Sequence, residues 1–123
     1  MTLVNDLVTI TSSICSAFTA GKVPEGQAAP YAVVYGSSLM PASRTLDAKA
    51  LRRETARVMA VSNNQTGAAT LALRIGNSVD ATVSPTDNTP LYVSHISDPY
   101  QDTSDPSEEW WTATIEVRHY QNP

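Results

Sequence analysis

The sequence predicts an α+β domain, in which an antiparallel sheet of about four strands carries two helices on one face. Two segments, 2–20 and 67–79, repeat apolar residues at helical spacing. Four others are rich in β-branched and aromatic residues, and the expected order is α-β-β-α-β-β. Strands and helices do not alternate as βαβ units would require, so the sheet should be antiparallel with its helices on one side. A chain of 123 residues is expected to form a single domain over 1–123.

The first half should contain one helix and two strands. The apolar stripe of the helix over 2–20 consists of Leu3, Leu7, Ile10, Ile14 and Phe18, and Gly21 stands where a helix-ending glycine is common. PYAVVYG at 30–36 predicts a short buried strand, and 52–62 predicts the next one. Between them, 37–51 should form a polar turn with a possible helical turn near 46–51.

The second half should contain the other helix and two strands. Thr66 is the expected cap of the helix over 67–79, whose buried stripe should include Leu71, Ile75 and Val79. A strand is expected at 91–97 and the last one at about 108–120, with an extended acidic loop rich in Pro and Ser at 97–109 between them.

Alternation along the last strand predicts which face each residue occupies. Trp111, Ala113, Ile115, Val117 and His119 fall on one face, which we expect to be the core face. Trp110 falls on the other face and should be covered by a neighbouring subunit or by another segment of its own chain. We expect it to be covered only in an assembly.

Composition excludes several classes of protein. The formal net charge of −4 argues against a surface that grips nucleic-acid phosphates, which needs a basic footprint. Cys15 is the only cysteine, so no disulfide within the chain is possible. We expect no signal peptide, because the start lacks a basic segment and carries Asp6 within its apolar pattern. We expect no membrane span, because no apolar run approaches about 20 residues.

No pattern of catalytic or metal-binding residues is present, so we expect no enzyme, metal or cofactor. His95 and His119 lack a second ligand at metal-binding spacing and are interpreted as structural. The acidic run of 97–109 lacks the glycine turn and alternating ligands of a calcium loop. The competing hypothesis is a small ligand-binding or enzymatic α+β module, with its best candidates at His95, Asp98 and Tyr100.

The candidate functional residues belong to an interface. Arg52, Arg53 and Arg57 form the one basic cluster, which is either a solvated strand edge or a partner for an acidic segment of a neighbouring subunit. The predicted interface residues are Trp110, Arg52, Arg53, Arg57, Glu108 and Glu109.

Four segments resemble the tail terminator proteins of long-tailed bacteriophages. They are the N-terminal helix, PYAVVY at 30–35, RVMAVSNN at 57–64 before an Ala-rich helix, and the closing EEWWTATIEVRHY. The resemblance implies a homohexameric ring that caps the tail tube and joins the tail to the head-side connector or stopper protein. It also implies that genomic DNA passes through the lumen without sequence-specific binding, and that the protein resides in the virion neck after assembly in the host cytoplasm.

A related alternative is another neck protein, either a head-closure stopper or a connector adaptor. An interaction adaptor of the host cell is a further alternative.

Overall fold

The computed structural model describes residues 2–44, 50–80, 82, 90–102 and 110–121. Its elements, in order, are α1 (Thr2–Thr11), β1 (Ser16–Thr19), β2 (Tyr31–Arg44), β3 (Ala50–Ser62), α2 (Gln65–Val79), β4 (Leu91–Ile96), β5 (Tyr100–Asp102) and β6 (Trp110–Gln121). Neither described helix is long and apolar enough to cross a membrane.

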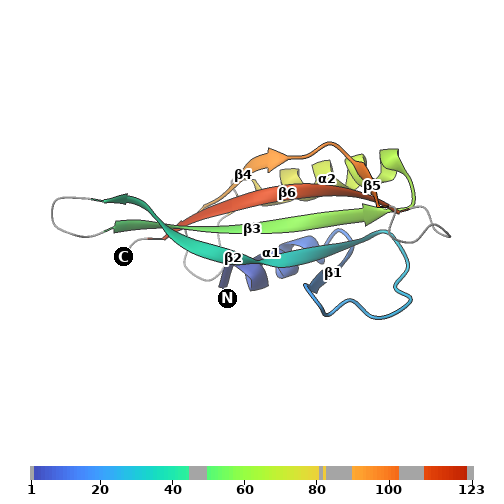
Figure 1. Ribbon diagram of the computed structural model, residues 1–123, viewed down its shortest axis with the longest axis horizontal. Coiled ribbons are helices and arrows are strands. Elements are labelled where there is room, and N and C mark those ends of the chain that lie inside the picture. The colour runs from blue at the N-terminus through green and yellow to red at the C-terminus, as the bar shows by residue number, and fades with distance from the viewer. Residues whose placement is uncertain (1, 45–49, 81, 83–89, 103–109, 122–123) are drawn as a thin grey trace.

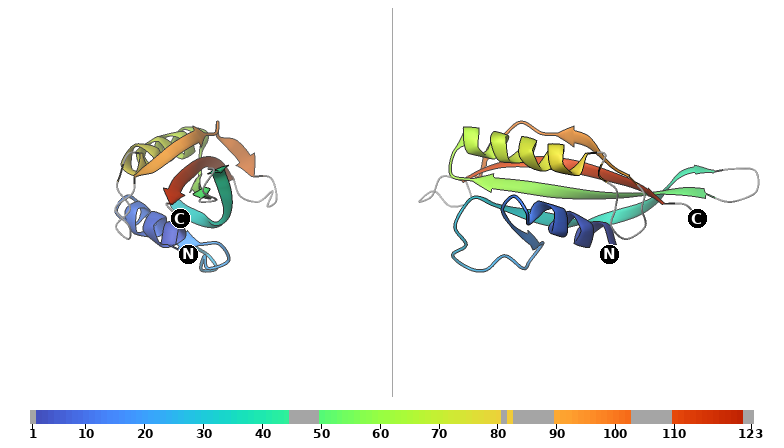
Figure 2. Two further views of the ribbon diagram at one scale, coloured as in Figure 1. Left: turned by 90° about the vertical axis from the view of Figure 1, so that its left-hand side faces the viewer. Right: turned by 180° about the vertical axis from the view of Figure 1, so that it is seen from behind.

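All the strands belong to one mixed sheet that is covered by helices on one face. The strand order is β1-β2-β3-β6-β4, and β5 pairs with β6 beyond the end of β4. Among the described strand pairs, β1 and β2 are parallel, whereas the others are antiparallel. Figure 1 views the helix-free face, and Figure 2 shows α1 and α2 together on the opposite face. The α+β class with two helices is therefore confirmed, but the sheet has six strands and is not wholly antiparallel.

The core lies between the two helices and the sheet, and the predicted stripes supply it. Leu3 and Leu7 of α1 and Leu71, Ile75 and Val79 of α2 are all 5% exposed or less. They pack with alanine and branched aliphatic side chains of β2, β3 and β6. Alanines at these positions let the helices approach the sheet closely, because a methyl group adds little thickness.

The first helix is much shorter than predicted. It ends at Thr11, and of the residues expected to continue it, 12–15 form a turn and Ser16–Thr19 form β1. The hydroxyls of Ser12 and Ser13 donate hydrogen bonds of 2.8 Å to the carbonyls of Thr9 and Ile10. Such side-chain hydrogen bonds compete with those of the helix backbone and favour a turn at this point. Gly21 has the expected positive φ of 79°, but it follows a strand and not a helix.

The central hairpin is longer than predicted. β2 runs through Pro41 to Arg44, so the polar turn expected at 37–51 is mostly strand. Two register shifts, between Tyr35 and Ser38 and between Pro41 and Ser43, interrupt its pairing with β3 and make room for these residues. The possible helical turn near 46–51 falls largely outside the described residues, but its last two residues are in β3. In Figure 1 this hairpin projects beyond the helices, at the end of the molecule opposite β5.

The second helix matches its prediction except at its start. Asn64 is its N-cap, and the Asn64 side chain accepts a hydrogen bond of 2.6 Å from the Gly67 N–H. Thr66, the predicted cap, lies inside the first turn. Asparagine and threonine both serve as caps, so residue type alone could not choose between two positions so close in sequence.

The last two predicted strands are confirmed, and a short one was missed. β4 and β6 match the segments at 91–97 and 108–120 to within two residues at each end. Within the predicted 97–109 loop, Tyr100–Asp102 form β5 on β6. Residues 103–109, including Glu108 and Glu109, lie outside the described part of the chain.

Candidate functional site

The helix-free face of the sheet is concave and bears the exposed aromatic side chains. The sheet curls around this face, as the end-on view of Figure 2 shows. In the register, Tyr35 lies opposite Arg57, which in turn lies opposite Glu116. Tyr100 lies opposite Thr112 in a row nearer the start of β6. Three of the four large hydrophobic side chains that are exposed among the described residues belong to this face, namely Tyr35, Tyr92 and Tyr100, at 40%, 46% and 47%.

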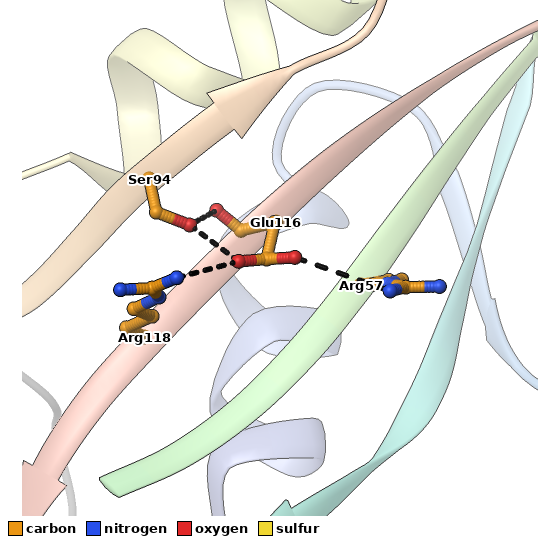
Figure 3. Close-up of polar contacts among 4 residues, drawn as sticks. All are labelled: Arg57, Ser94, Glu116 and Arg118. Atoms are coloured by element: carbon orange, nitrogen blue, oxygen red, sulfur yellow. Dashed lines mark hydrogen bonds and ion pairs between the residues drawn. The ribbon is translucent and has the colours of Figure 1, made fainter. Parts of the chain in front are cut away.

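A charged cluster occupies the middle of this face (Figure 3). Glu116 Oε1 accepts hydrogen bonds from Ser94 Oγ at 2.8 Å and from Arg118 Nη2 at 3.3 Å. Its other carboxylate oxygen lies 4.0 Å from Arg57 Nη2. A register shift between Val93 and His95 occurs at Ser94, which also donates to the Glu116 carbonyl at 3.3 Å.

The cluster holds Glu116 in its charged form. The Ser94 hydrogen bond lowers the pKa of the Glu116 carboxyl, and the hydrogen bond and charge of Arg118 and the charge of Arg57 add to this effect. Partial burial acts in the opposite direction and is outweighed. Glu116 is therefore ionised at neutral pH and offsets one of the two arginine charges beside it.

A hollow of about 520 Å³ opens next to this cluster. Its lining comes from β2, β3, β5 and β6 and consists of Tyr35, Gly36, Thr55, Ala56, Arg57, Met59, Tyr100 and Thr114. The Arg57 side chain is 65% exposed, so its guanidinium is accessible at the hollow. An arginine among tyrosines is the composition typical of a protein contact surface.

Trp110 and Trp111 do not divide into one core residue and one exposed residue. Both are partly buried, whereas Ala113, Ile115, Val117 and His119 are buried as predicted. The Trp110 ring packs edge-on against Tyr31 with centroids 6.2 Å apart, and Tyr31 packs in the same way against Phe18 at 6.3 Å. The prediction that only an assembly covers Trp110 is therefore wrong, because part of its cover comes from its own chain.

Among the predicted interface residues that the structure describes, Trp110 and Arg57 lie far apart on the sheet. Trp110 precedes Glu116 by six positions on β6, so roughly 20 Å of strand separates it from the cluster beside Arg57. Arg52 and Arg53 pair with Gln121 and Tyr120 at the other end of β6. The side chains of Arg52 and Arg53 lie outside what the structure describes, as do Glu108 and Glu109 altogether.

The residues that the sequence analysis missed are Ser94, Glu116, Arg118 and Tyr35. Alternation along β6 does assign Glu116 and Arg118 to the face away from the core, so that signal was available. Ser94 and Tyr35 join them only through strand pairing, which spacing along the chain does not reveal.

The rival enzymatic candidates are not brought together. His95 lies opposite Glu116, and Tyr100 lies opposite Thr112, so roughly 13 Å of β6 separates their partners. Both side chains are exposed, as is Asp98. Within the described ranges, no three His, Cys, Asp or Glu residues gather as a metal site.

The lone cysteine is half-buried on the helix side of the molecule. Cys15 packs against the core without entering it, so the prediction of a buried side chain is only partly met. Burial raises the pKa of the Cys15 thiol, and the charge of Arg74 lowers it by a smaller amount.

Comparison with known proteins identifies a fold and no family. No protein-family description matches the sequence, and no curated protein matches it. Among solved structures, a chain from the virion of a native gene transfer agent particle matches with a TM-score of 0.62 and 12% sequence identity. The match covers 95% of this chain and 84% of that one, so the two share a fold over nearly their whole length.

Proposed function

We propose that this protein is a structural component of a phage-type virion, with no catalytic activity, and that it acts as a tail terminator. The observation that carries the proposal is the concave helix-free face, where exposed tyrosines surround an accessible arginine. Such a face is suited to binding protein. The similarity in fold to a virion chain of a gene transfer agent supports a particle as the setting.

The proposed mechanism is geometric. Copies of the chain form a homohexameric ring, one side of which matches the tail tube protein and the other the head-side connector or stopper protein. Tube growth stops when the ring occupies the tube end, because the ring presents a surface to which tube subunits no longer add. The protein is then part of the virion neck, assembled in the host cytoplasm.

Genomic DNA would pass through the lumen of this ring. The chain carries a formal net charge of −4, so a ring built from it repels phosphate overall. This charge supports passage of DNA without sequence-specific binding. Basic residues on the helix-free face are consistent with this role if that face is engaged by protein and does not line the lumen.

The six predicted interface residues are not equally supported by the structure. Arg57 is the best supported residue, because its side chain is exposed beside a hollow. Trp110 remains a proposed contact through the part of its ring that Tyr31 does not cover. Contacts by Arg52, Arg53, Glu108 and Glu109 remain predictions from the sequence.

Native mass spectrometry and a tail assembly assay test the proposal. We expect a closed ring of the purified chain, formed alone or on tail tube protein, and tubes that stop elongating when it is added. A chain that stays monomeric in both settings would rule the proposal out. Binding to the head-side connector without any effect on tube growth would instead identify a head-closure stopper or connector adaptor.

A catalytic role is tested separately. We expect His95→Ala to have little effect on ring formation and tube capping, because His95 does not line the hollow beside Arg57. Turnover of a small molecule that this substitution abolishes would favour the enzymatic alternative.

A further inference from the structure

We propose that the hollow on the helix-free face binds a carboxylate-bearing surface of a second copy of this chain, with Arg57 as its anchor. The proposal rests on the ring described above and specifies its contact. One copy would present the helix-free face, and the next would present a different, acidic surface. The ring contact would therefore be head-to-tail.

The first argument is that the Arg57 guanidinium is only weakly engaged within its own chain. Glu116 receives hydrogen bonds from Ser94 and Arg118 at Oε1, so the best acceptor nearby is already engaged. Arg57 lies 4.0 Å from the remaining oxygen, at the outer limit of an ion pair, and its side chain is 65% exposed. A guanidinium has five N–H donors in a planar fork that fits a carboxylate with two parallel hydrogen bonds.

The second argument is the surroundings of Arg57. Tyr35 and Tyr100 border the hollow and are exposed by 40% and 47%, and Met59 contributes an apolar side chain. Tyrosine and arginine are the residue types that most often dominate binding energy at protein interfaces. A partner side chain that enters this hollow would be shielded from water, which strengthens its attraction to the guanidinium.

The third argument identifies the occupant from charge. Arg57 and Arg118 outweigh Glu116 by one positive charge, whereas the chain as a whole carries −4. Two copies that met through this same face would set these arginines against their equivalents, which is unfavourable. The face must then meet a different surface, and the second copy offers exposed carboxylates, among them Glu25 and Asp98. Contacts between two different surfaces are those that generate rings.

The fourth argument gives the side from which the partner approaches. The outer edge of β4 is already used, because the Thr82 carbonyl accepts the Leu91 N–H at 2.8 Å and Asp80 Oδ1 accepts the Val93 N–H at 3.0 Å. At the opposite side, no described strand pairs with the outer edge of β2 beyond Val34. The hollow begins at the next residue along β2, so a partner segment can reach it from this open edge.

Charge reversal at Arg57 tests the anchor. Arg57→Glu should weaken self-association by about tenfold or more, the size typical of a central interface arginine. Arg74→Glu is the matched control, because Arg74 is an exposed arginine on α2, on the opposite side of the sheet. It makes the same change in net charge and should leave association nearly unchanged. Analytical ultracentrifugation gives both association constants, and circular dichroism confirms that both variants fold.

Photo-crosslinking identifies the occupant. A photoreactive phenylalanine analogue replaces Tyr35 in one preparation and Leu73, the exposed hydrophobic residue of α2, in another. Each is mixed with isotope-labelled wild-type chain, with and without tail tube protein. We expect the probe at position 35 to crosslink labelled copies at an acidic segment, and the probe at 73 to do so much less.

The two proposals fail in distinguishable ways. A ring that forms normally in Arg57→Glu, or that crosslinks only from position 73, would overturn the inference and leave the ring intact. Crosslinks from position 35 to tail tube protein, or to the same face of the second copy, would overturn it as well. Absence of any wild-type ring would contradict the proposed function, and the inference would fall with it.

Discussion

Replacing Glu116 by glutamine tests whether the charged cluster stabilises the helix-free face. The glutamine keeps the size of the side chain and an oxygen that can accept from Ser94, but it removes the negative charge between Arg57 and Arg118. We expect lower stability at neutral pH, with the register of β6 against β3 and β4 unchanged.

The expected magnitude follows from the geometry of the three contacts. The 2.8 Å bond from Ser94 is short and charge-assisted, and such bonds contribute about 1.5–3 kcal/mol against about 1 for a neutral one. The arginine contacts at 3.3 and 4.0 Å are longer and lie at a solvent-accessible site, where ion pairs contribute about 0–1 kcal/mol. We therefore expect a loss of about 1 kcal/mol, or a shift of about 0.3–1 M in the urea midpoint.

The sign of the pH dependence is fixed by the lowered pKa of Glu116. The unfolded carboxyl titrates at about pH 4.3. The folded one has a lower pKa, because its charged form is hydrogen-bonded. The stabilisation is thus complete above the unfolded pKa and is lost as pH falls through the folded pKa. The difference between wild type and Glu116→Gln should be present at pH 7 and shrink below about pH 4.

Urea titrations of both proteins across this pH range provide the measurement. Glu25→Gln is the matched control, because Glu25 is exposed on the loop between β1 and β2 and the net charge changes equally. It should leave the midpoint nearly unchanged at every pH. A Glu116→Gln deficit that is as large at pH 3 as at pH 7, or an equal deficit in the control, would refute the electrostatic reasoning.

The remaining predictions concern α2 and use the same urea titrations. Asn64→Ala should cost about 1 kcal/mol by removing the cap, whereas Thr66→Ala should cost much less; the reverse order would contradict the assigned cap. Gly67→Ala should destabilise despite the better helix propensity of alanine, because its Cβ would collide with Ser62 Oγ; a more stable variant would contradict this geometry. Gly76→Ala is the comparison, since its Cβ meets only the flexible end of one isoleucine, and its stability should change by less than about 1 kcal/mol.

Local sequence patterns correctly predicted those elements whose buried face is encoded within one continuous segment. The stripe of Leu71, Ile75 and Val79 is set by helical spacing, and all three are buried where expected. The alternation of β6 likewise placed Ile115 and Val117 in the core. In both cases the burial of one face is encoded within a single continuous segment.

The missed features depend on pairing between distant segments. β1 exists because Ser16–Thr19 find a parallel partner in β2, although Phe18 also continues a helical stripe. β5 spans only three residues and is defined by its pairing with β6. Such short strands have little intrinsic preference, so tertiary contacts decide their conformation.

The charged cluster around Glu116 escaped the sequence analysis for a related reason. Clustering along the chain singled out Arg52, Arg53 and Arg57 together, whereas the observed charged cluster draws Arg57, Ser94 and Glu116 from three strands. Only the register of β3, β6 and β4 brings these residues together.

The tryptophan pair illustrates how the structure redirects the functional argument. A large exposed aromatic at the head of a strand indicated a subunit contact at Trp110, yet Tyr31 already covers part of that ring. The most exposed aromatic side chains on the face are instead tyrosines around and beside the hollow at Arg57, several positions further along the sheet. Binding is favoured by side chains that bury exposed apolar area in the interface. A side chain already packed within the monomer has less exposed area left to bury. The centre of the proposed ring contact therefore moves from the start of β6 to the middle of the concave face.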